Sequence, residues 1–188
     1  MKKGTIILLA VVAVIAVWCV SAYNGLVSKQ EQVSEAWANV ETVYQRRADL
    51  IPNLVSTVKG YATHEQETFL LTVEARAKAA KVDPATATPE QLADWQKTQD
   101  DVLNAINVVV EAYPELKANT NFLELQAQLE GTENRISVER RNYNEKVKDY
   151  NVKIRKFPTN LLAGIFGFEK MAMFEAQDGA EVAPTVEF

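Results

Sequence analysis

The N-terminal part of the chain is an uninterrupted run of apolar side chains. Residues 4–22 contain no charged residue, and Thr5 and Ser21 are their only hydroxyl-bearing residues. A helix of this length rises about 28 Å, which is close to the hydrocarbon thickness of a bilayer. The pattern therefore predicts a transmembrane helix over residues 4–22.

The basic residues around this run predict its orientation. Lys2 and Lys3 precede it, whereas the first basic residue after it is Lys29. Lysine and arginine favour the cytoplasmic side of a membrane span. We therefore expect a single-pass protein of the bacterial cytoplasmic (inner) membrane, with its N-terminus in the cytoplasm and its C-terminal domain periplasmic or extracellular. A signal peptide cleaved after Ala22 is the alternative, although the run is longer than the apolar core of most signal peptides.

Beyond residue 23, apolar side chains recur every three or four positions, the spacing of one face of an α-helix. No segment shows the sustained alternation typical of a strand. The sequence therefore predicts an all-α fold, with a transmembrane helix followed by an antiparallel up-and-down bundle. Three stripes carry the pattern: Leu26, Val33, Trp37, Val40, Tyr44, Ile51, Leu54, Val58 and Tyr61; Leu92, Trp95, Val102, Ile106, Val109 and Tyr113; and Leu129, Ile136, Tyr143, Val147, Tyr150, Ile154 and Phe157.

The number of helices depends on where the first stripe breaks. Lys59-Gly60, followed by a capping box at residues 63–66, favours a break near Gly60. Pro52 is the alternative break, or only a kink. We expect four helices, at about 24–60, 64–81, 89–112 and 115–156. Four antiparallel helices return the C-terminal end of the chain to the membrane, whereas three leave it at the far end.

Turn and capping residues give the remaining boundaries. Thr88, Pro89 and Gln91 have the spacing of an N-cap, a first-turn proline and a capping box. Pro158 closes the regular part of the sequence. The expected division is a cytoplasmic N-terminus at 1–3, the transmembrane helix at 4–22, a bundle domain at 23–157, an apolar C-terminal segment at 158–176 and a flexible tail at 177–188.

Composition excludes several classes of function. Twenty Lys and Arg against 25 Asp and Glu give a net charge of −5, which does not suit a nucleic-acid-binding surface. One Cys and one His exclude an intrachain disulfide and a Cys/His zinc site. His64-Glu65 lacks the second histidine of a metalloprotease motif, because position 68 is Thr. We therefore expect no enzyme, no catalytic residue, no cofactor and no metal.

Charged residues on the apolar stripes mark a candidate buried polar network. Arg47 lies on the first stripe, and Glu133 and Arg140 lie on the third. An unpaired charge there is very costly, so a network between helices is required. It is interpreted either as a polar layer that fixes helix register, the favoured reading, or as an internal binding site for an acidic group. The candidate residues are Arg46, Arg47, Asp49, Asn53, Glu133, Arg140 and Asn144, with Arg46 and Asp49 expected to pair on the helix surface.

Two further features concern the end of the chain. The pairs Tyr143-Asn144 and Tyr150-Asn151 repeat at seven residues and predict an amide ladder between helices. The segment that follows is too short and too rich in glycine to span a bilayer. Its apolar residues must be covered by the bundle itself, by a second subunit or by the outer leaflet. Those residues are Leu161, Leu162, Ile165, Phe166, Phe168, Met171 and Phe174.

Several motifs, taken in order, closely resemble the LemA family of bacterial membrane proteins. They are YN-x-LV at 23–27, AW-x-NV at 36–40, RR-x-DLIPNLV from Arg46, YP-x-LKA at 113–118, and E-x-RI-x-x-x-R-x-x-YN-x-x-V-x-x-YN at 133–151. The resemblance covers about Tyr23 to Phe174. It implies an N-terminal anchor followed by an antiparallel helical bundle outside the cytoplasm. It supplies no catalytic residue, cofactor or substrate.

These observations favour a non-enzymatic, membrane-anchored scaffold or interaction protein of the bacterial cell envelope. We expect the lipid bilayer as one partner, self-association into a homo-oligomer, and contact with another membrane protein as a further possibility. The alternative is a ligand-binding or regulatory accessory subunit of a membrane protease or signalling complex, using the polar cluster at residues 46–53. A hydrolytic enzyme is disfavoured because no nucleophile or metal motif is present.

Overall fold

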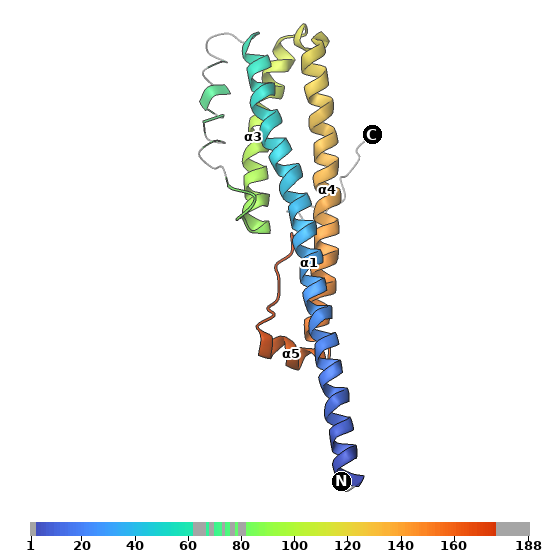
Figure 1. Cartoon of the computed structure of the whole chain (residues 1–188). Coiled ribbons are helices and arrows are strands. Elements are labelled where there is room, and N and C mark those ends of the chain that lie inside the picture. Colours follow the sequence, from blue (N-terminus) through green and yellow to red (C-terminus); the bar gives the residue numbers. More distant parts are fainter. Residues whose placement is uncertain are drawn as a thin grey trace, which may run out of the picture. The chain divides into compact units, whose positions relative to one another are not determined.

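The computed structural model describes residues 3–61, 67, 70–72, 74, 75, 78 and 82–175 (Figure 1). Its elements are α1 (Lys3–Lys59), α3 (Pro89–Ala112), the 3-10 helix η1 (Leu116–Ala118), α4 (Thr120–Arg155) and α5 (Thr159–Phe166). The described residues between 67 and 78 are also helical, and no strand occurs in the described part of the chain. The prediction of an all-α fold is therefore confirmed.

The described residues form two compact units. Unit 1 contains residues 3–40 and 138–172, and unit 2 contains residues 41–137 and 173–175. Helices α1 and α4 each contribute to both units.

Helix α1 runs through Pro52 and ends at Lys59, so the helix break lies at Gly60. The capping box expected at residues 63–66 lies outside the described residues. Residues 4–18 of the apolar run at the start of α1 are all exposed, and Leu26 is the first buried side chain along the helix. The N-terminal part of α1 contains an 18-residue window with a mean hydropathy of 2.7, which is long and apolar enough to cross a membrane.

In unit 2, α1 packs against α3 and α4 (Figure 1). Tyr44 and Arg47 contact Gln96 on α3, and Arg47 also contacts Glu133 on α4. Just beyond the end of α1, the Tyr61 hydroxyl accepts a hydrogen bond from Asn119, which directly precedes α4. Contacts that lie later on α1 therefore lie earlier on α4, so the two helices run antiparallel. The core between the helices contains the residues predicted by the stripes: Ile51, Leu54, Val58, Val102, Ile106, Val109 and Leu129, joined by Leu50, Val55, Leu70, Ala105, Val110, Leu116 and Phe122.

The helix ends confirm one predicted boundary and correct two others. The capping box at the start of α3 is confirmed, because the Thr88 hydroxyl accepts from the Gln91 amide and the Gln91 side chain accepts from the Thr88 amide. Helix α4 begins at Thr120, not at 115, and the Asn119 side chain accepts from the Phe122 amide at 3.0 Å. The assignment of Phe157 to the third stripe is wrong, since α4 ends at Arg155 and Phe157 is 80% exposed. The residue before a proline disfavours helical backbone, which accounts for the early end.

In unit 1, α1 and α4 again run antiparallel. Lys29 forms an ion pair with Asp149 at 2.9 Å, and further along α1 the ring of Trp37 lies 5.0 Å from that of Tyr143. After α4 the chain turns into α5, which lies beside α1 (Figure 1). The Tyr23 ring on α1 is 4.9 Å from the Phe166 ring. Helix α5 thus returns to the point where the apolar run of α1 ends, as expected for an even number of antiparallel helices. The helix expected at 64–81 lies largely outside the described residues.

Candidate functional site

The most unusual feature of unit 2 is a buried arginine with partners on two other helices. The Arg47 side chain on α1 has no exposed surface. Its Nη2 atom pairs with Asp100 on α3, its Nε atom pairs with Glu133 on α4, and its Nη1 atom donates to the Gln96 carbonyl oxygen at 3.3 Å. One guanidinium therefore joins the three helices, in a fork geometry that lysine cannot supply.

A second set of contacts holds these partners in place. The Tyr44 hydroxyl donates to Gln96 Oε1 at 2.9 Å, and Gln96 Nε2 donates to Glu133 Oε2 at 3.3 Å. The Tyr44 ring stacks on Trp95, with centroids 6.5 Å apart. We call Tyr44, Arg47, Gln96, Asp100 and Glu133 the Arg47 cluster. Its polar side chains are bonded to one another, so the guanidinium is neutralised by carboxylates of this same chain.

The surroundings of Glu133 in the cluster shift the pKa of its carboxyl group. Burial raises the pKa of the Glu133 carboxyl group above its usual value of 4.5, and the nearby Asp100 carboxylate raises it further. The positive charge of Arg47 acts in the opposite direction but does not reverse the shift. The folded protein therefore disfavours the ionised form of Glu133 relative to the unfolded chain.

This shift predicts how stability depends on pH. Because the pKa of Glu133 is raised on folding, its contribution to stability is fully present below pH 4.5 and is lost as pH rises through the folded-state pKa. The Glu133→Gln variant should lack this component. We expect the difference in urea midpoint between Glu133→Gln and the parent to move in favour of the variant as pH rises from below 4.5 to neutrality. A difference independent of pH would contradict the assignment.

Only two of the candidate network residues come together in this cluster, namely Arg47 and Glu133. Arg46, Asp49 and Asn53 are exposed on α1. The expected pairing of Arg46 with Asp49 is replaced by a bond from Gln45 Nε2 to Asp49 Oδ1 at 2.9 Å. Arg140 and Asn144 belong to unit 1, where both are half-buried and have partners of their own.

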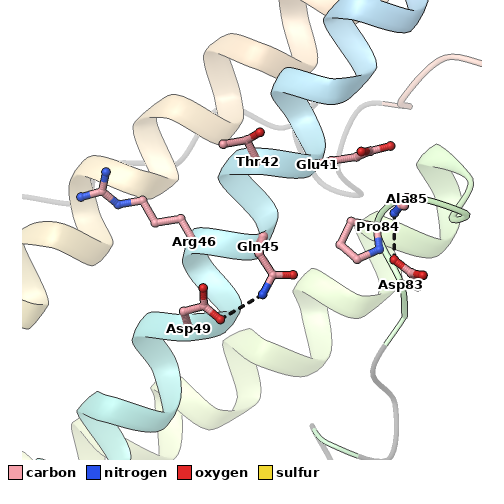
Figure 2. Close-up of a pocket in the computed structure, with 8 residues that line it drawn as sticks. All are labelled: Glu41, Thr42, Gln45, Arg46, Asp49, Asp83, Pro84 and Ala85. Atoms are coloured by element: carbon pink, nitrogen blue, oxygen red, sulfur yellow. Dashed lines mark hydrogen bonds between the residues drawn. The ribbon is translucent and has the colours of Figure 1, made fainter.

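Arg46 and Asp49 line a surface pocket of about 480 Å³ in unit 2 (Figure 2). One wall is α1, and the other is the turn at Asp83, Pro84 and Ala85 that precedes α3. Figure 2 shows the Arg46 side chain directed away from this turn, whereas Asp49 and Asp83 lie on opposite walls. The remaining lining residues are Glu41, Thr42, Gln45. With carboxylates on both walls, the pocket suits a cationic side chain of a partner better than an acidic ligand.

The C-terminal segment is attached to α4 through its backbone. Asn151 Nδ2 donates to the Met171 carbonyl oxygen at 2.9 Å, and Asn151 Oδ1 accepts from the Met171 amide at 3.0 Å. The Tyr143 hydroxyl donates to the Ala172 carbonyl oxygen at 3.1 Å. The predicted amide ladder is therefore wrong for Asn151, because its side-chain amide bonds to the backbone of Met171, which lies in a segment with no regular secondary structure.

The apolar candidates of this segment divide into two groups. Leu162 and Phe174 are buried, and Phe168 and Met171 are half-buried. The other candidates remain exposed: Leu161, Ile165 and Phe166.

The paired bonds of Asn151 predict a local effect of substitution. Asn151→Ala removes both side-chain hydrogen bonds of the Met171 backbone and leaves these partly buried groups without their protein partner, at a cost of about 1 kcal/mol, the lower end for an unsatisfied group. We expect faster hydrogen exchange at the Met171 amide and faster proteolysis after Lys170, with α1 and α4 intact by circular dichroism. Asn151→Asp keeps the acceptor and loses the donor, so its exchange and proteolysis rates should fall between those of the parent protein and those of Asn151→Ala. Unchanged exchange at Met171 in Asn151→Ala would contradict the attachment.

Sequence reasoning missed three members of the Arg47 cluster. Gln96 is adjacent to the stripe residue Trp95, Asp100 lies two residues before the stripe residue Val102, and Tyr44 was interpreted only as an apolar stripe residue. A usable signal was present. Residues 96, 99 and 100 place amide and carboxylate groups on the same side of α3, and a buried cation needs such groups opposite it.

Comparison with known proteins gives a consistent picture. The model of the LemA family matches residues 36–188. Protein LemA of Metamycoplasma hominis is 28% identical over 156 residues, covering 82% of this chain and 69% of the relative. Magnetosome protein MamQ 2 of Paramagnetospirillum magneticum is 29% identical over 195 residues, covering 92% of this chain and 71% of the relative. Magnetosome protein MamQ of Magnetospirillum gryphiswaldense is 27% identical over 181 residues, covering 85% and 66%.

The family match covers most of the chain, including the Arg47 cluster, the acidic pocket and the C-terminal segment. The resemblance drawn from the sequence motifs is thereby confirmed. This chain belongs to the LemA family.

Proposed function

We propose that this protein is a non-enzymatic, membrane-anchored scaffold or interaction protein of the bacterial cell envelope. The observation that carries the proposal is the change in burial along α1. Residues 4–18 are exposed and carry no charged side chain. On the same helix Leu26 is buried, and from Val33 to Val58 successive buried side chains are at most four residues apart. An apolar helical surface of this extent requires a nonaqueous environment, and its length matches a bilayer.

The orientation follows from the charges on either side of the run. Lys2 and Lys3 stand before it, and Lys29 is the first basic residue after it. The positive-inside bias therefore favours a cytoplasmic N-terminus and an external bundle. The names of the relatives denote no reaction, so they supply no enzymatic activity to carry over to this chain. Two of them are named as magnetosome proteins, and that assignment belongs to those proteins.

We infer that self-association occurs through the apolar run of α1. In unit 2 most large apolar side chains on the stripes are buried in the core, so few remain exposed to form an interface between two copies of the chain. Within a bilayer, helices associate through close van der Waals packing, and the run contains Ala10, Ala13 and Ala16, which permit close approach.

The single cysteine provides the test of self-association, because Cys19 lies in this run. Mild oxidation of native membranes should yield a crosslinked dimer. Cys19→Ser should abolish it, and single cysteines placed in turn at positions 15–22 of that variant should crosslink with helical periodicity. Uniformly absent crosslinking along the scan would refute self-association by this helix.

The acidic pocket favours a second candidate function, that of an accessory subunit to another membrane protein. Carboxylates of Glu41, Asp49 and Asp83 line it on both sides, and such a surface attracts a basic segment of a partner. A photo-crosslinking residue at Thr42 should capture that partner in cells. Capture should fall in an Asp49→Asn/Asp83→Asn background and persist in a Val108→Ala control, whose exposed side chain is on α3 outside the pocket. Capture that is indifferent to the carboxylates would count against this function.

A further inference from the structure

We propose that α5, together with Phe157 just before it, forms a second membrane contact. This contact lies in the interfacial region of the outer leaflet, beside the point where α1 leaves the bilayer. The lipid-facing residues are Phe157, Leu161, Ile165 and Phe166, which we call the α5 face. The proposal rests on the proposed anchoring by α1 and adds to it an occupant for an apolar surface that the bundle does not cover.

The position of α5 is the first argument. Tyr23 follows directly after the apolar run of residues 4–22, and its ring contacts both Phe166 at 4.9 Å and Phe168 at 5.8 Å. Both contacts lie within unit 1. Tyrosine with an apolar ring and a polar hydroxyl is favoured at the boundary between hydrocarbon and water. If α1 spans the bilayer, α5 is therefore held at the level of that boundary.

The division of α5 into two faces is the second argument. Leu162 and Ala163 are buried at 8% and 3% exposed. On the other face Leu161 and Ile165, one helical turn apart, are 57% and 75% exposed. Phe166 is 54% exposed and Phe157 is 80% exposed. One side of α5 thus docks on the protein, with Phe166 at its edge against Tyr23. The exposed side carries Leu161 and Ile165 together with Asn160 and Gly164, so it is mainly apolar and uncharged.

The charges around α5 are the third argument. Residues 157–168 contain no charged side chain, whereas Arg155, Lys156, Glu169 and Lys170 flank them and are exposed. Basic side chains bordering an apolar face can extend to lipid headgroups while the face enters the acyl region. This arrangement is that of an interfacial helix and not of a soluble surface.

The α5 face is also held in a fixed place. Gly167 adopts a φ of 73°, which ends α5 in a left-handed cap, and the Phe168 amide donates to the Ala163 carbonyl oxygen at 2.9 Å. Downstream, Asn151 fixes the Met171 backbone to α4. The exposed face is therefore presented by a structured element that is anchored at both ends.

Lipid suits this face better than a second copy of the chain does. Four partly exposed side chains offer roughly 500 Å², against about 800 Å² per partner in a typical stable interface. The face is also continuous with Tyr23, and through it with the surface of α1 that the proposed anchor assigns to lipid.

The test uses the full chain reconstituted in vesicles of neutral phospholipid. In a Cys19→Ala background, single cysteines at Ile165, Ile15 and Val138 carry an environment-sensitive fluorophore, and vesicles contain lipids with a quencher attached near the headgroup or near the chain end. Ile15 lies in the apolar run and reports on the anchor. Val138 is the matched control, since it is 55% exposed and apolar, belongs to unit 1, and lies far from α5 along α4.

We expect the fluorophore at position 165 to emit at shorter wavelength than the one at 138 and to lose intensity with the shallow quencher more than with the deep one. Position 15 should lose more with the deep quencher, and position 138 with neither. Quenching at 15 without quenching at 165 overturns the α5 contact and leaves the anchor standing. A short-wavelength emission at 165 without quenching indicates cover by protein and also overturns it. Absence of quenching at 15 refutes the anchor, and with it the inference. Leu161→Cys repeats the measurement if the label at 165 perturbs α5.

Discussion

Arg47→Ala is expected to lower the free energy of unfolding by about 3 kcal/mol, at the lower end of what breaking a buried ion pair costs. The substitution leaves the Glu133 and Asp100 carboxylates without their shared cation and opens a cavity between α1, α3 and α4. The lower end applies because Glu133 and Asp100 are partly exposed, at 34% and 46%, and can recover some hydration. Denaturant unfolding of the full chain in detergent, followed by circular dichroism, measures the loss.

The matched variant for this prediction is Arg47→Met/Glu133→Gln. Methionine refills the volume of the arginine stem, and the glutamine removes the more buried of the two charges left without a partner, whereas Asp100 is half exposed and can be hydrated. This double variant should therefore recover most of the stability lost in Arg47→Ala. Arg47→Met alone should fall between the two, because it still leaves Glu133 charged. If Arg47→Ala were as stable as the parent protein, the Arg47 cluster would not hold the helices together, and an interpretation as a ligand site would gain support.

Two charges in the apolar run should have the second large effect. Val11→Arg/Ile15→Arg places two arginines one helical turn apart near the centre of the span, where each costs about 3 kcal/mol on insertion. We expect the protein to move from the alkali-resistant membrane pellet to the soluble fraction. The α5 face alone is too small to retain it there.

The control for this prediction carries an arginine outside the run. Val108→Arg alters an exposed side chain of α3 and should leave the protein in the pellet, as should Val11→Leu/Ile15→Leu. Retention of the double-arginine variant in the pellet to the same extent as the leucine variant would show that residues 4–22 are not the membrane anchor.

The fold could be predicted largely from helical spacing, because burial in a bundle repeats with the period of the helix. Leu92, Ile106 and Val147 were placed on stripes and are buried at 0%, 1% and 0% exposed. Spacing alone does not show where a stripe stops. Phe157 continues the period but follows the end of α4, and only the proline after it indicated the boundary.

The partners of polar groups were harder to predict than the positions of apolar ones. The spacing showed that Arg47 lies inside and needs a counter-charge, but 25 acidic residues could have supplied it. Asp100 was not identified because it lies off the apolar stripe, a position that usually faces solvent. In the structure its side chain is indeed half exposed. Asn151 was misread for a different reason. Its partner is the backbone of Met171, and no side-chain pattern encodes a backbone contact.

The central claim is that residues 4–22 cross the membrane and hold the helical bundle outside the cytoplasm. Protease protection tests it most directly, with an epitope tag placed after Phe188 and a cytoplasmic protein as an internal control. The account predicts that trypsin added to right-side-out spheroplasts degrades the bundle, and that inverted membrane vesicles protect it until detergent is added. Protection in intact spheroplasts together with degradation in inverted vesicles would contradict it.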